Sequence, residues 1–95
     1  MHARISYYDL GGASGDDVKR GFEKAVASVK DMQGSHGGMA LVNQQEGKAV
    51  TITLWESEDA LRSTEQQADQ VRADAASSAG VTITDVERYQ VVLEF

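Results

Sequence analysis

His36 is the residue whose side chain is best suited to move a proton near neutral pH. It is one of two histidines and directly precedes Gly37 and Gly38 in a segment that reads as a loop. An imidazole titrates near ~6.5, which suits a general base. No partner residue lies beside it in the sequence, so a solvated loop histidine is the competing interpretation. His2 stands next to the N-terminus, and the two histidines lack the spacing of metal ligands, so we predict no metal site.

Arginine side chains offer a second kind of chemistry, because a buried guanidinium can stabilise an anionic intermediate. Arg4 and Arg88 lie in segments that read as strands. They would meet if those strands were neighbours and both side chains faced inward. We take Arg88 as a candidate for stabilising developing negative charge. The alternative is an ion pair with Glu87, Glu94 or a carboxylate of a partner subunit, because charges are rarely buried unless they are paired.

Tyr7 and Tyr8 are adjacent, so in a strand their side chains must point to opposite faces of the sheet. One of them therefore faces the pocket side of the sheet whatever the register. A phenolic hydroxyl there can hydrogen-bond a substrate oxygen or take part in a proton transfer. Packing with the hydroxyl at the rim of an interface is the competing interpretation.

Composition limits the classes of protein to which these residues can belong. The chain has 95 residues, and we predict a single domain over residues 1–95. Nine Lys and Arg against fifteen Asp and Glu give a net charge of −6, which argues against nucleic-acid binding. There is no cysteine and no apolar run near the ~18 residues of a membrane span. We expect no signal peptide, because the first thirty residues lack an apolar core. We expect a cytoplasmic protein without a nucleic-acid or membrane partner.

The first third of the chain reads as a strand followed by a helix. Residues 3–10 are rich in strand formers. Ser14 and Asp17 have the spacing of a capping box. A helix is predicted over residues 15–33, because apolar residues recur at spacings of three and four and draw one buried stripe: Val18, Phe22, Ala25, Val29 and Met32.

Residues 39–43 and 49–55 are two apolar runs around a polar turn, which predicts a hairpin. A two-residue turn at Glu46 and Gly47 would create a large aliphatic face on which Met39 pairs with Leu54, Leu41 with Ile52 and Asn43 with Val50. The opposite face is smaller and mixed: Gly38, Ala40, Val42, Thr51, Thr53 and Trp55. We expect the aliphatic face to lie under helices and the face with Trp55 to lack a cover within the monomer.

The last third predicts one helix over residues 57–79 and a strand over residues 84–94. Ser57 is the expected N-cap of that helix, and Gly80 its end. The order is β-α-β-β-α-β, which predicts a ferredoxin-like α+β fold: a four-stranded antiparallel sheet with two helices on one face. A half-apolar sheet face left open on so small a protein predicts a homodimer.

The segment from Gly47 to Leu61, GKAVTITLWESEDAL, resembles the GKA-x-(S/T)ITLW-(D/E)-S-E-E-A-L segment of antibiotic-biosynthesis-monooxygenase-like proteins. These belong to the dimeric α/β-barrel superfamily. Residues 2–6 and 86–91 also resemble a bacterial subgroup of that family. The resemblance covers nearly the whole chain. It is specific for fold and unspecific for activity, because the superfamily includes oxygenases, haem degraders, isomerases and proteins without an assigned role.

The resemblance implies a homodimeric α/β barrel with a pocket in each subunit, between sheet and helices or within the barrel. It implies a cofactor-independent monooxygenase-like enzyme acting with O₂ on a small aromatic substrate of the phenol, anthrone or quinol type. The substrate supplies the electrons, so no cofactor is expected. Haem-degrading members use a histidine on the second helix, and residues 57–79 contain none, so we do not expect haem degradation.

In the family that the sequence resembles, a tryptophan at the place of Trp55 lines the substrate pocket, and Thr53 is its neighbour on the same face. A large residue filling the core is the competing interpretation of Trp55. Some relatives bind the substrate oxygen with an asparagine, which makes Asn43 a candidate. Its position beside the hairpin end suggests a turn-forming residue instead.

Two other functions remain open from the sequence. One is a non-catalytic dimeric module that binds a small hydrophobic ligand or serves in a stress response. The other is a lactone isomerase-like enzyme, which needs acid and base groups but no O₂. A set of polar side chains converging in one pocket would favour an enzyme over a binding module.

Overall fold

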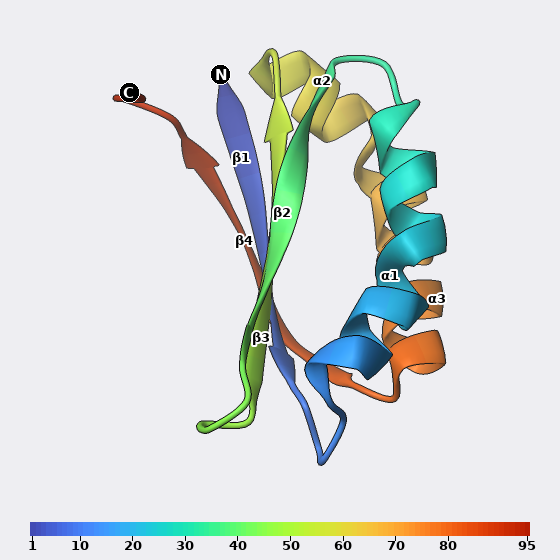
Figure 1. Ribbon diagram of the computed structural model, residues 1–95. Coiled ribbons are helices and arrows are strands. Elements are labelled where there is room, and N and C mark those ends of the chain that lie inside the picture. Colours follow the sequence, from blue (N-terminus) through green and yellow to red (C-terminus); the bar gives the residue numbers. More distant parts are fainter.

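One antiparallel sheet of four strands carries all helices on one face in the computed structural model, which describes residues 1–95 (Figure 1). This confirms the predicted ferredoxin-like α+β fold. In chain order the elements are β1 (His2–Asp9), α1 (Gly15–Lys30), β2 (Ser35–Asn43), β3 (Lys48–Trp55), α2 (Glu58–Ser63), α3 (Glu65–Ala79) and β4 (Thr82–Gln90).

Helix α1 begins with the capping box that the sequence predicts. The Ser14 side chain accepts a hydrogen bond from the Asp17 N–H at 3.1 Å, and Asp17 accepts one from the Ser14 N–H at 2.9 Å. Val18 and Phe22 are the buried residues of the helix. The helix ends at Lys30, earlier than the predicted residue 33, and Gly34 then adopts a positive φ of 84°.

The predicted helix over residues 57–79 is two helices, α2 and α3. Thr64 separates them, and its hydroxyl donates a hydrogen bond to the carbonyl oxygen of Ala60 at 2.7 Å. A threonine hydroxyl that bonds back to the preceding turn competes with the helical pattern. None of the three helices is long and apolar enough to cross a membrane.

The strands lie in the order β2-β3-β1-β4, so β1 is central and pairs with both β3 and β4. The β2–β3 turn has four residues, 44–47, instead of the predicted two. As a result, Met39 pairs with Ile52 and Leu41 pairs with Val50. The shift is two residues, so each side chain keeps its predicted companions on the same face.

The prediction of which face the helices cover was wrong. Trp55 lies beneath the helices, with none of its surface exposed, and packs with Met32 and Leu61. The aliphatic face points away from the helices, and Met39 on it is 57% exposed. The reason is that the helices cover a pocket. The side chains that the sheet contributes to this pocket are mostly polar, so the larger aliphatic residues of the strands lie on the other face.

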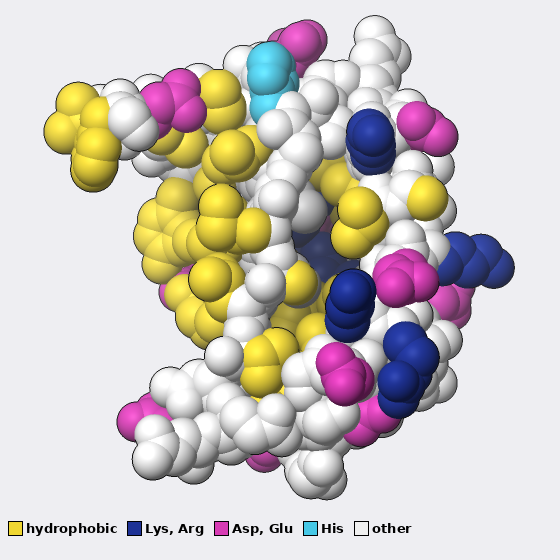
Figure 2. Space-filling model, viewed as in Figure 1, with side chains coloured by type: hydrophobic (Ala, Val, Ile, Leu, Met, Phe, Trp, Pro, Cys, Tyr) yellow, Lys and Arg dark blue, Asp and Glu magenta, His cyan; other side chains and the backbone are white.

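We call that other side the open face. Register places eight side chains together on it: Ile5, Tyr7, Met39, Leu41, Val50, Ile52, Leu54 and Tyr89. Figure 2 shows hydrophobic side chains gathered on the side of the sheet opposite the helices. A patch of this kind on a small domain is characteristic of an interaction surface.

Candidate functional site

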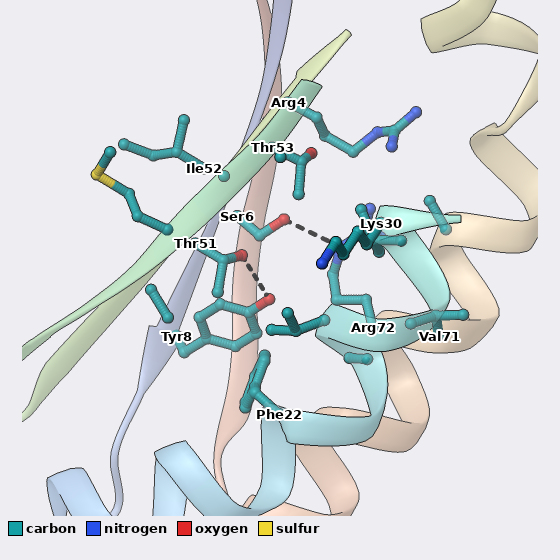
Figure 3. Close-up of a pocket in the computed structure, with 18 residues that line it drawn as sticks. Arg4, Ser6, Tyr8, Phe22, Lys30, Thr51, Ile52, Thr53, Val71 and Arg72 are labelled. Carbon is teal, nitrogen blue, oxygen red and sulfur yellow. Dashed lines mark hydrogen bonds between the residues drawn. The ribbon is translucent and has the colours of Figure 1, made fainter. Parts of the chain in front are cut away.

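A pocket of about 280 Å³ lies between the sheet and helices α1 and α3. Figure 2 shows a hollow beside β2 with Lys or Arg atoms at its bottom, and Figure 3 shows the side chains around it. Alternate residues of β1 reach into it, because side chains of a strand alternate between faces: Arg4, Ser6 and Tyr8. Thr51 and Thr53 join them from β3.

The helices supply the apolar walls of the pocket. Six helical residues form these walls: Phe22, Ala25, Val26, Val29, Ala68 and Val71. The polar groups therefore come mainly from the sheet, and the apolar ones from the helices. Apolar walls with a few converging polar groups are typical of small-molecule sites.

Arg4 is the most deeply buried charge, with 2% of its side chain exposed. Its Nη2 donates hydrogen bonds to the carbonyl oxygen of Leu61 at 2.7 Å and to Glu65 at 3.0 Å. Its guanidinium also lies over the ring of Trp55, 5.1 Å from the centroid. Burial, followed by the charges of Arg72 and Arg88, lowers the pKa of Arg4 to about 10. Arg4 therefore remains a cation at neutral pH.

Arg72 reaches from α3 toward the sheet. Its Nε donates to the hydroxyl of Ser6 at 3.0 Å, and its Nη1 donates to Asp69 at 2.7 Å. The first of these bonds is drawn in Figure 3. Arg72 and Arg4 thus bring two guanidinium groups to one pocket. Asp69 keeps part of the Arg72 charge neutralised, and Glu65 does the same for Arg4.

Tyr8 supplies the only phenolic hydroxyl in the pocket lining. That hydroxyl and the Thr51 hydroxyl are 3.0 Å apart and share a hydrogen bond. The Tyr8 ring meets Phe22 edge to face, with 5.3 Å between centroids. The ring is thereby held in place, and its hydroxyl is available at the sheet side of the pocket (Figure 3).

Trp55 does not line the pocket but supports it. Its indole Nε1 donates a hydrogen bond to the hydroxyl of Thr53 at 3.0 Å, and the guanidinium of Arg4 lies over its ring. Both of those residues do line the pocket. Trp55 therefore orients two side chains of the pocket from behind.

Of the seven site residues named from the sequence, Tyr8 and Thr53 line the pocket. Tyr7 lies on the open face, where hydrogen bonding to Glu87 raises its pKa. His36 is exposed near the start of β2, next to the lining residue Gly37. These two side chains are not brought to the same place as Tyr8.

Arg88 and Asn43 also lie outside the pocket lining. Arg88 is the register partner of Arg4 on the neighbouring strand β4, as envisaged from the sequence, and forms an ion pair with Glu65. Asn43 accepts a hydrogen bond from the N–H of Glu46 at 3.1 Å, which is the turn-forming arrangement weighed above.

The sequence analysis missed Ser6, Thr51, Arg72 and Lys30, which all line the pocket. The alternation of Arg4, Ser6 and Tyr8 could have placed Ser6, since residues two apart share a face. No sequence pattern indicated that Arg72 lines the pocket. Arg72 flanks a stripe of small residues on α3, and in the sequence such a charged helix residue looks like one that faces solvent.

No group of three or more His, Asp or Glu side chains is placed to hold a metal ion.

The fold recurs among solved structures, whereas no protein-family profile and no curated protein matches the chain. SnoaB of Streptomyces nogalater, a cofactor-independent oxygenase, is 16% identical with a TM-score of 0.74, covering 98% of this chain and 94% of SnoaB. A Deinococcus radiodurans protein proposed to be an antibiotic biosynthesis monooxygenase is 14% identical with a TM-score of 0.71, covering 100% and 96%. These neighbours fit the resemblance seen in the sequence and share the fold of this chain.

MhuD of Mycobacterium tuberculosis, a heme-degrader whose structure has two hemes in its active site, is 20% identical. Its TM-score is 0.72, with 100% of this chain and 99% of MhuD covered. In this chain neither His2 nor His36 lines the pocket. The lining residues therefore do not supply a histidine ligand for a haem.

Proposed function

We propose that this protein is a cofactor-independent monooxygenase-like enzyme that oxidises a small aromatic compound of the phenol, anthrone or quinol type. The observation that carries the proposal is the convergence of Arg4, Arg72 and Tyr8 in one pocket with apolar walls. A flat aromatic ring suits the walls, and an oxygen atom on that ring suits the cationic and hydroxyl groups at the sheet. The cofactor-independent oxygenase SnoaB has the same fold.

The two arginines favour the ionised form of a bound phenol or enol, because nearby positive charge lowers the pKa of an acidic group. The resulting anion is electron-rich and reacts with O₂. One oxygen atom enters the substrate, and the other leaves as water with two hydrogens of the substrate. In an anthrone a CH₂ becomes C=O, whereas a phenol or naphthol loses one ring C–H hydrogen and its O–H hydrogen and becomes a quinone. All electrons come from the substrate. Tyr8 and Thr51 hydrogen-bond the oxygen of the substrate ring. These bonds fix the position of the substrate carbon that reacts with O₂.

The open face supports a second part of the proposal, a homodimer. Leu41 is 47% exposed and Met39 is 57% exposed on this face. A second copy that places its own open face against this one would bury both faces and form a barrel of two sheets. The helices and the pocket then remain on the outside of the barrel, one pocket in each subunit.

Oxygen uptake by the purified protein tests the proposed reaction. The substrates are a panel of anthrones, naphthols and hydroquinones, and the variant is Arg72→Gln. We expect uptake above the uncatalysed rate and a loss of about 100-fold in the variant, the scale of removing one charge-stabilising donor. Arg62→Gln is the matched control, because Arg62 is an exposed arginine on α2, away from the pocket.

The same assay separates the other functions. Turnover of a lactone substrate without O₂ consumption would indicate an isomerase. Thermal stabilisation by these compounds without any turnover would indicate a binding module. Either result would contradict the proposed oxygenase.

A further inference from the structure

The pocket is lined by positive charge only. Arg4, Lys30 and Arg72 line it, and no Asp or Glu is among the lining residues. This is unexpected in a chain that carries fifteen acidic residues against nine basic ones. The two acids that pair with the arginines, Glu65 and Asp69, lie behind them and outside the lining. A neutral ligand would leave the third cation, Lys30, without a counterpart.

Lys30 differs from the two arginines in its place and its partners. It is the last residue of α1 and is exposed, and it lines the pocket together with Gly37 and Gly38 of β2. It takes part in no ion pair within the chain. Its ammonium group is therefore free to receive an anion, whereas the arginines are already partly neutralised.

Apolar residues of α1 line the pocket together with Lys30. Val26 and Val29 precede Lys30 on α1, and Phe22 lies deeper, against Tyr8. In Figure 3 Lys30 comes from the helix side, and Arg4, Ser6 and Tyr8 come from the sheet side. The pocket thus combines a polar, cationic floor at the sheet with apolar walls from the helices and one cation without an ion-pair partner, the exposed Lys30.

We propose that the ligand of this pocket is an aromatic acid: a ring that bears a hydroxyl or enol oxygen at one end and a carboxylate at the other. The ring oxygen contacts the floor near Arg72 and Tyr8, and the carboxylate pairs with Lys30. This inference rests on the proposed function for the use of the pocket and adds the class of substrate. It assigns to Lys30 the role of selecting ligands that carry an acidic group.

Lys30 also has a structural role, because a cation in the last turn interacts favourably with the helix dipole. That role does not depend on the ligand. The test must therefore compare ligands that differ only in charge, and it must compare Lys30 with another lysine of the same helix. Lys19 serves for this purpose, since it is exposed on α1 and lies outside the pocket lining.

Calorimetric titration with 6-hydroxy-2-naphthoate and with its methyl ester provides the comparison. The two compounds share the ring and the hydroxyl, and only the acid carries a charge at the far end. We expect the acid to bind the unaltered protein about five times more tightly than the ester, the factor typical of a partly exposed ion pair. In Lys30→Gln this preference should disappear, while Lys19→Gln should retain it.

Equal affinity for acid and ester in the unaltered protein would overturn the proposal, as would an equal loss of preference in both lysine variants. Failure of both compounds to bind would overturn it as well. Binding is measured without O₂ turnover, so the outcome is independent of the proposed oxygenation. A preference for the acid that depends on Lys30, in a protein that consumes no O₂, would support the ligand class and refute the oxygenase.

Discussion

At the scale of single residues, the buried Arg4 is held by three different contacts. Glu65 pairs with its charge, the carbonyl oxygen of Leu61 accepts a second hydrogen bond, and Trp55 lies under the guanidinium. Its Nε remains buried without a hydrogen-bond partner. Such groups are rare in folded proteins because each one costs free energy. Arg4 lines the pocket, and an unpaired buried donor at such a place favours a functional role for this residue.

Trp55→Ala should lower the free energy of unfolding by about 3–5 kcal/mol, the usual cost of deleting a buried aromatic side chain. The ring is fully buried against Met32 and Leu61. Urea unfolding followed by circular dichroism measures the change. A variant with unchanged stability that no longer binds the naphthoate would contradict the supporting role assigned to Trp55 and would place it in direct contact with ligand.

The candidate site was predictable in part at this scale. Tyr8 and Thr53 were named from strand alternation and from the family resemblance, and both line the pocket. Arg72 was not predicted, because its contact with Ser6 depends on how α3 packs over β1, and no local sequence pattern reveals that packing. Trp55 was grouped with the correct neighbours, but its face was expected to lie open, because strand alternation groups side chains by face and does not say which face the helices cover.

At the scale of elements, α1 and α3 approach closely where both carry small residues. A Cβ on Gly21 would lie 2.6 Å from the backbone nitrogen of Ala79, closer than real Cβ contacts. The alanine stripe of α3 permits this approach. Because α1 and α3 form the walls of the pocket, their separation sets its width.

Gly21→Ala should therefore destabilise the protein, although the same change in an unobstructed helix stabilises it by roughly 0.5–1 kcal/mol. The sign of the change in stability therefore tests whether α1 and α3 are in contact at Gly21. A higher melting temperature in the variant, measured by differential scanning calorimetry, would show that the two helices are not in the contact described.

Ser14→Ala removes a side-chain cap from α1 and should cost about 1 kcal/mol at neutral pH. Hydrogen bonds from the Ser14 backbone and side chain hold the pKa of Asp17 below its usual 3.8. A carboxylate with a lowered pKa stabilises the fold above its unfolded pKa, and this contribution is lost as the pH falls through the folded value.

Urea unfolding at pH 7 measures the cost of Ser14→Ala, and comparison of pH 7 with pH 3 tests the contribution of Asp17. The unaltered protein should lose stability between these values, and Asp17→Asn should lose less, because it lacks the titrating group. Equal pH dependence in the two proteins would rule out Asp17 as a source of the acid sensitivity.

The order of elements and the cap of α1 were predictable because they depend on local patterns: capping spacing, apolar periodicity and turn residues. Strand and helix boundaries moved by a few residues at most ends. The break at Thr64 was not predictable, since residues 57–79 carry no proline or internal glycine. It arises because the Thr64 hydroxyl bonds the Ala60 carbonyl.

At the scale of the whole molecule, the open face predicts self-association. Light scattering at micromolar concentration should give a mass near twice the 10.3 kDa of one chain. Leu41→Glu puts a charge on the open face, where Leu41 is 47% exposed, and should give a monomer. Ala27→Glu changes an exposed residue of α1 on the opposite side of the sheet and should leave the dimer intact. A monomeric unaltered protein would exclude the two-sheet barrel.

The central claim is that the floor of the pocket stabilises the anion of an aromatic substrate. The most direct measurement is the pKa of 2-naphthol bound to the protein, followed by the long-wavelength absorption band of its anion in the absence of O₂. The pKa of the bound naphthol should fall by about one unit relative to water, the shift expected beside an arginine. Arg72→Gln should remove most of the shift and Arg62→Gln none of it. A bound naphthol whose pKa is unchanged or raised would contradict the claim.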